Sequence, residues 1–220
     1  MRRTALVFAL AFVTTLIGVS GAASKTSKGT FDVHVGDNFA PPLAAPSVAQ
    51  AANGDTITIV LTGAFNAATK SASGGGTFVH KHGATVLASG TLTLTRTIAF
   101  QFYGCGVAPN GSTFPSNFCG GRVLLAAHLV GHPASNPSAT VERDALLEVN
   151  CQVHSTTISP PAGTSEGIKL VVKHGGPNFN KHVSGANLFV QTASASSHSN
   201  SNHSNSNHSN SKHSKSKHSK

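Results

Sequence analysis

The chain has 220 residues and a formal net charge of +9, yet only 10% of its residues are charged and it contains no tryptophan. Most of the excess positive charge lies near the two ends, because residues 25–191 hold ten lysines and arginines against seven carboxylates. The net charge is therefore no evidence for a nucleic-acid-binding domain, because the body shows no basic face, and we expect no specific nucleic-acid partner.

The N-terminus has the pattern of an export signal. Arg2 and Arg3 precede a largely apolar run of about 15 residues, and small residues follow up to Ala23. We therefore predict a signal peptide over residues 1–23, cleaved near Ala23, and a secreted or periplasmic protein. The run is shorter than the roughly 20 residues that cross a bilayer, so we expect no membrane span in the mature protein.

Residues 24–191 are the size of one domain, and their dominant period is two, which is the period of a β-strand. In 141–153, for example, apolar residues occupy most odd positions and polar residues most even ones. In 91–103, the threonines at 91, 93, 95 and 97 are expected on the face opposite Leu92 and Leu94. Strands are expected around residues 31–35, 57–61, 77–82, 91–103, 123–129, 141–153, 168–173 and 186–191.

Clusters of Gly, Pro, Asn and Ser separate these runs, and no window shows a helical period with caps at both ends. The sequence therefore predicts an all-β domain of about seven to nine antiparallel strands. Such a set of strands forms a β-sandwich or a closed β-barrel, and periodicity does not choose between them.

Three cysteines occur in the domain. Cys105 and Cys119 bracket a turn-rich loop, and a disulfide between them is the expected pairing in an exported protein. Cys151 lies on the apolar side of its strand and would then be a buried free thiol. The spacing leaves the other two pairings open.

From residue 192 the composition changes to serine, asparagine, histidine and lysine. This segment, 192–220, cannot bury enough apolar surface to offset its ordering entropy, so we expect it to be disordered. Its histidines recur every five residues, at His198, His203, His208, His213 and His218. Imidazoles bind zinc, copper and nickel, which predicts loose metal binding by the tail. The alternatives are a solvated extension and, through its four lysines, adhesion to anionic cell-surface polymers.

Within the domain, His80 and His82 are the best candidate metal ligands, since residues two apart on a strand share a face. The segment 74–82 resembles the first motif of the cupins, in which a glycine precedes a His-x-His pair. The glutamate expected a few residues later is absent, because Val86 and Leu87 occupy that region. The alternative is a pair of exposed polar residues near a strand end.

Arg96 and Arg143 both fall on the apolar parity of their strands. Because an unpaired buried charge is costly, two inward arginines would need carboxylates or an anionic ligand, and could line an anion-binding cavity. The alternative is that each lies at a strand end or a bulge and reaches water.

Residues 74–190 resemble a set of uncharacterised exported bacterial all-β proteins. The shared pieces are Gly-Gly-Thr-Phe at 75–78, Ser-Gly-Thr at 89–91, Phe-Gln-Phe-Tyr-Gly at 100–104, Leu-Glu-Val at 147–149 with Cys151, Phe-Asn at 179–180 and Val-Ser-Gly at 183–185. The resemblance implies export and β architecture, and it implies no activity.

No nucleophile elbow, zinc-helix motif or phosphate loop occurs in the sequence. The sequence therefore favours a non-enzymatic binding or surface protein, with the tail as an auxiliary metal-binding or adhesive element. The alternative is a metal-dependent enzyme or metal carrier with a site near His80 and His82.

Overall fold

The computed structural model describes residues 29–40 and 45–193. The predicted signal peptide lies outside these residues, as does all of the predicted tail except Thr192 and Ala193. The described residues form strands and turns without a helix, which confirms the all-β class. The strands number ten, more than the seven to nine expected.

The two strands that periodicity did not predict are short and lie near polar segments. They are β2 and β9, of five and seven residues. The complete set is β1 (Thr30–Val35), β2 (Ser47–Ala51), β3 (Asp55–Asn66), β4 (Ala72–His82), β5 (Thr85–Cys105), β6 (Phe118–Pro133), β7 (Val141–Cys151), β8 (Gly167–Val172), β9 (Asn178–Ser184) and β10 (Asn187–Ala193).

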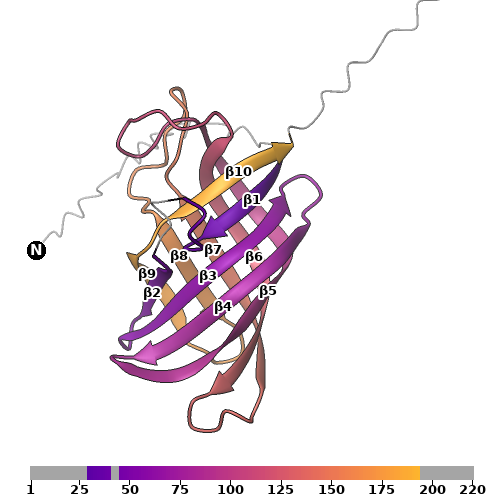
Figure 1. The fold of residues 1–220 in the computed structure, drawn as a ribbon, viewed down its shortest axis with the longest axis vertical. Helices are drawn as coiled ribbons and strands as arrows, with labels where there is room; N and C mark the ends of the chain where they lie inside the picture. Colours follow the sequence, from indigo (N-terminus) through magenta and orange to yellow (C-terminus); the bar gives the residue numbers. More distant parts are fainter. Residues whose placement is uncertain (1–28, 41–44, 194–220) are drawn as a thin grey trace, which may run out of the picture.

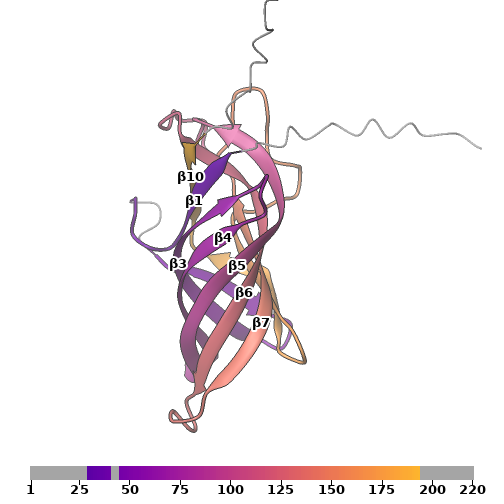
Figure 2. The same cartoon turned by 90° about the vertical axis from the view of Figure 1, so that its right-hand side faces the viewer.

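All ten strands belong to one antiparallel sheet, in the order β1-β10-β6-β5-β4-β3-β2-β9-β8-β7 (Figure 1). Two further pairings, β1 with β3 and β6 with β7, join each end of this order to a strand in its interior. Every strand therefore pairs with at least two others. The strands coil past one another along the length of the molecule, as the side view in Figure 2 shows.

The core lies between the inward faces of this sheet. On β7 the odd residues from 145 to 151 are buried, as the alternating pattern predicted. Val141 and Arg143 share that parity but are exposed, because the first four residues of β7 extend beyond the core. The buried row on β7 is Ala145, Leu147, Val149 and Cys151. Its residues pair, in that order, with Ala127, Leu125, Val123 and Gly121 on β6.

Phenylalanines from four strands cluster in the core. Phe31 of β1 stacks on Phe65 of β3 with ring centroids 5.3 Å apart, and Phe100 of β5 meets Phe65 edge-on at 4.9 Å. Phe189 of β10 lies edge-on to Phe65 at 5.4 Å. Such offset and edge-on pairs contribute about 0.5–1.5 kcal/mol each beyond the area they bury, so this cluster holds the ends of the chain to the middle of the sheet.

The prediction that Thr97 lies on the outer face of β5 is wrong. Thr97 is only 1% exposed, and its hydroxyl donates a hydrogen bond to the carbonyl oxygen of Ser71 at 2.7 Å. The pairing of β5 with β6 shifts between Leu94 and Arg96 and again between Thr97 and Ala99. Each β-bulge inserts one residue and reverses which parity faces the core. The first of these bulges thus turns Thr97 inward.

Glycine allows β3 and β4 to approach closely at one point of their ladder. Gly63 pairs with Gly74, whose φ is +99°. A Cβ at Gly74 would lie 2.4 Å from the Cα of Gly63, closer than any side chain tolerates. The glycine run at 74–76, which precedes the candidate histidines, is therefore part of β4 itself.

Candidate functional site

A pocket with a volume of about 590 Å³ lies where two long loops meet the start of β10. One loop joins β5 to β6 and the other joins β7 to β8, and Figure 1 shows both at the upper end of the molecule. Most of its wall is apolar. The lining residues used below are Ala108, Phe114, Phe118, Val153, Glu166 and Leu188.

Among the described residues, Glu166 is the only ionisable one in the pocket wall, and its carboxylate joins two distant segments. One oxygen, Oε2, accepts the backbone N–H of Gln152, and the other, Oε1, accepts the backbone N–H of Asn187, both at 2.7 Å. The side-chain amide of Asn187 donates in turn to the carbonyl oxygen of Asn150 at 3.0 Å. Glu166 thus fixes the end of β7 against the start of β10.

Burial raises the pKa of Glu166 to about 7, although the two backbone N–H donors favour the charged form. Desolvation therefore outweighs hydrogen bonding here. None of the lysines, arginines and histidines in the described ranges forms an ion pair with Glu166. The pocket thus contains a carboxyl group that changes charge near neutral pH and has no protein counterion in this part of the chain.

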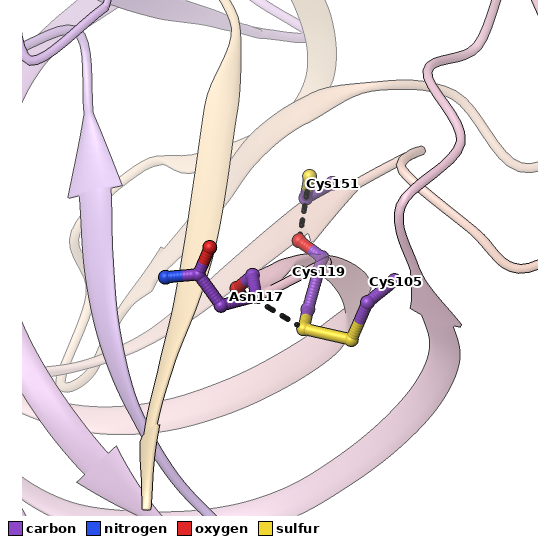
Figure 3. Close-up of a disulfide and its surroundings, with 4 residues drawn as sticks. All are labelled: Cys105, Asn117, Cys119 and Cys151. Carbon is purple, nitrogen blue, oxygen red and sulfur yellow. Dashed lines mark hydrogen bonds between the residues drawn. A yellow bond between two sulfur atoms is a disulfide. The ribbon is translucent and has the colours of Figure 1, made fainter. Parts of the chain in front are cut away.

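The predicted disulfide between Cys105 and Cys119 is confirmed (Figure 3). It closes the loop that carries Ala108, Phe114 and Phe118. Cys151 is free and buried, as expected, and burial raises the pKa of its thiol well above the ordinary value. The disulfide therefore anchors one wall of the pocket.

The other candidate residues, His80 and His82, converge on one carboxylate at the end of β4. His82 Nδ1 lies 2.7 Å from Oδ1 of Asp55, and His80 Nε2 lies 2.9 Å from Oδ2. These hydrogen bonds, that of His82 first, lower the pKa of Asp55 to about 2. The sequence did not indicate Asp55 as their partner, because the contact depends on the register of β3 with β4, in which Asp55 pairs with His82.

Asp55 thus bridges His80 and His82 through one hydrogen bond to each. Across residues 29–40 and 45–193, no group of three or more His, Cys, Asp or Glu side chains is placed to hold a metal ion. His80 also lies edge-on to Phe179 with ring centroids 5.3 Å apart, whereas the side chain of His82 is 66% exposed. His34 and His128 lie elsewhere, paired with Asp37 and with Glu142 and Asp144 respectively.

The two candidate anion-binding arginines are exposed and lie in different places. Arg96 follows the first bulge of β5 and borders a polar pocket of about 360 Å³ with Asp144 and Lys173. Arg143 borders a separate, largely apolar pocket of about 230 Å³, and its Nη1 donates to the carbonyl oxygen of Glu142 at 2.8 Å. They therefore do not share one inward-facing cavity. The candidate metal ligands in the tail, His198 to His218, lie outside the described residues.

Sequence reasoning missed the residues of the main pocket. Glu166 lies in a Thr-Ser-Glu-Gly segment that is indistinguishable from an ordinary polar turn, and Gln152 and Asn187 act through backbone N–H groups that no sequence pattern marks. The only available signal was that Glu166 is the last of the seven acidic residues and directly precedes a predicted strand.

Comparison of the chain with protein-family models, with curated proteins and with solved structures finds no match. In the residues that the structure describes, no helix has the length and apolarity to cross a membrane. What the pocket binds therefore has to follow from its own side chains.

Proposed function

We propose that this is an exported, non-enzymatic binding protein that takes up a small, largely apolar molecule in the pocket beside Glu166. The observation that carries the proposal is an apolar pocket of about 590 Å³ whose wall contains one buried carboxyl group. Pockets of this volume, mostly apolar with a few convergent polar groups, are typical of small-molecule sites. The disulfide and the N-terminal signal pattern support export.

The arrangement of the pocket favours binding over catalysis. Glu166 is held by two backbone N–H groups, and the other polar wall residues are amides and a hydroxyl: Asn110, Ser112, Gln152 and Asn187. Within residues 29–40 and 45–193, no histidine, cysteine or second carboxylate lines this pocket beside Glu166. A nucleophile paired with a base is thus not part of its wall.

The test is titration with N-phenyl-1-naphthylamine, a neutral apolar dye that fluoresces when it leaves water. We expect saturable fluorescence with the wild type. Ala108→Phe should remove it, because Ala108 lines the pocket and is only 3% exposed. Ala134→Phe, on an exposed residue of the β6–β7 turn, is the matched control and should bind as the wild type does.

Cooperative unfolding in urea is the control for folding, and we expect it for both variants. A wild type that does not bind the dye, or binding that survives Ala108→Phe in a folded protein, contradicts the proposal. A dye signal that Ala134→Phe also loses would place the dye elsewhere on the molecule and would contradict it as well.

We further propose that the tail is an auxiliary element that binds metal ions or adheres to anionic surface polymers through His198 to His218 and the four lysines. Zinc, copper and nickel are the ions to titrate into the mature chain and into a chain that ends at Ala193, which retains all of β10. Binding that disappears with the tail supports this role. A tight, stoichiometric site that remains in the shortened chain would instead favour the metal enzyme or carrier near His80 and His82.

A further inference from the structure

Glu166 lines the pocket, and its carboxyl group retains unused acceptor capacity. A carboxylate offers about four lone-pair sites, and the backbone N–H groups of Gln152 and Asn187 occupy one on each oxygen. Because Glu166 lines the pocket, a bound molecule can reach the remaining sites. A ligand that donates hydrogen bonds there would satisfy a buried group that the protein satisfies only in part.

In the part of the chain that the structure describes, no positively charged side chain pairs with Glu166 or lines its pocket. Its neighbours in the pocket wall are apolar or neutral, so its field is little screened. Two other titratable groups lie close by. Cys151, at the end of β7, is a neutral buried thiol, and His182 of β9, against which Gly167 packs, has its pKa lowered by burial. Neither supplies a cation at neutral pH.

We propose that the ligand of this pocket carries a protonated amine, whose ammonium group pairs with Glu166 while an apolar body fills the remaining space between Phe114, Phe118 and Leu188. This inference rests on the proposed function and names its ligand class. The charge complementarity singles out an amine: an ammonium both donates to the free lone pairs of the carboxylate and neutralises a desolvated charge. An alcohol does only the first, and a carboxylate ligand would add a second negative charge.

The affinity for an amine must depend on pH in a defined direction. An ammonium pairs with the ionised carboxylate, and Glu166 ionises near pH 7. A primary aliphatic amine resembles the lysine side chain and stays protonated at pH 8. The affinity should therefore be highest at pH 8 and fall by up to about tenfold per pH unit below 7. A neutral ligand should show no such rise.

The experiment compares hexylamine, 1-hexanol and hexanoate as competitors of the neutral dye, at pH 5.5 and pH 8. With the wild type at pH 8 we expect hexylamine to compete about tenfold or more better than 1-hexanol, and hexanoate least. Glu166→Gln should abolish the preference for the amine and its pH dependence. If Glu166 served only to join the two strands, the substitution would leave the ranking of the three competitors unchanged.

The outcomes separate this inference from the proposed function. If all three competitors displace the dye equally at both pH values, the amine is overturned and the apolar pocket stands. If the folded wild type binds neither dye nor competitor, the proposed function itself fails. Should Glu166→Gln not fold, the pH profile of the wild type decides, because a flat profile for hexylamine overturns the inference without the variant.

Discussion

Cys151 donates a hydrogen bond from its thiol to the carbonyl oxygen of Cys119, with 3.5 Å between the sulfur and the oxygen (Figure 3). The free cysteine therefore lies one strand away from a cysteine of the disulfide, since Cys119 is on β6 and Cys151 on β7. Thiol–disulfide exchange requires the thiolate. Burial raises the pKa of Cys151 and keeps its thiol protonated, so Cys151 does not attack the Cys105–Cys119 disulfide.

We predict that Cys151 does not react with iodoacetamide in the native protein at pH 8, because its thiol is both fully buried and protonated. Mass spectrometry should detect no modification after an hour, and one modification once the protein is unfolded in guanidinium without reductant. Peptide mapping should find the Cys105–Cys119 disulfide in both samples. Native labelling of Cys151, or a disulfide that includes it, would contradict this prediction.

Asp55 should protect the fold against acid. Its pKa of about 2 lies below the ordinary value of 3.8, so its contribution to stability is complete above pH 4 and is lost as the pH falls toward 2. Asp55→Asn should lower the free energy of unfolding at pH 6 by about 1–3 kcal/mol, since it weakens two hydrogen bonds to a charged group.

The difference between Asp55→Asn and the wild type should shrink as the pH falls from 4 to 2. Urea unfolding at several pH values measures this. Asp32→Asn is a matched control, because the side chain of Asp32 has no hydrogen bond or ion pair within the described ranges and should show no such trend. A constant difference between Asp55→Asn and the wild type down to pH 2 would sink the prediction.

Glu166 should have the opposite effect on stability. Its pKa is raised from the ordinary 4.5 to about 7, so the folded state binds the proton more tightly than the unfolded chain does. Its contribution is complete below pH 4.5 and is lost as the pH rises through 7, by at most about 3 kcal/mol. We expect the wild type to lose stability relative to Glu166→Gln between pH 5 and pH 8.

The informative quantity for Glu166 is how the difference in stability between the wild type and Glu166→Gln changes with pH. Glutamine also forfeits one of the two backbone hydrogen bonds, which lowers stability by an amount that does not depend on pH. Parallel stability curves for the two proteins across this range would show that Glu166 does not titrate there.

Thr97→Val should destabilise the protein by about 1–2 kcal/mol, although threonine and valine have similar shapes. The buried hydroxyl of Thr97 donates to the carbonyl oxygen of Ser71, and valine leaves that acceptor with one hydrogen bond fewer. Thr93→Val, on an exposed face of the same strand, is the control and should change stability by less than about 0.5 kcal/mol. Equal effects of the two substitutions in urea unfolding would contradict the inward orientation of Thr97.

Thr97 also shows where sequence periodicity stops being informative. The alternation on β7 predicted the buried row from Ala145 to Cys151 because the strand pairs with β6 without a register shift. On β5, the bulge between Leu94 and Arg96 reverses the parity at Thr97, and a bulge leaves no mark in a period-two pattern. The class of the fold and the inward face at Leu92 and Leu94 were therefore predictable, whereas the orientation of Thr97 was not.

The same reasoning explains what could be predicted of the site. The spacing of His80 and His82 correctly placed them on one strand and one face. The role of Asp55 depends on the pairing of β3 with β4, and that of Glu166 on contacts with residues 14 and 21 positions away. Such contacts arise only when the whole sheet has assembled, so no local signal contained them.

The position of β10 has a consequence for how the chain reaches this state. β10 pairs with both β1 and β6. In the described part of the chain β1 is synthesised first and β10 last, so β1 and β6 cannot complete their pairing until β10 is present. Until residues 187–193 have left the ribosome, β1 lacks one of its two partners and exposes a hydrogen-bonding edge that can recruit other chains. Closure of the described sheet therefore requires β10 and depends on contacts of long sequence separation, which slows folding. Until β10 pairs, the open edge of β1 favours aggregation.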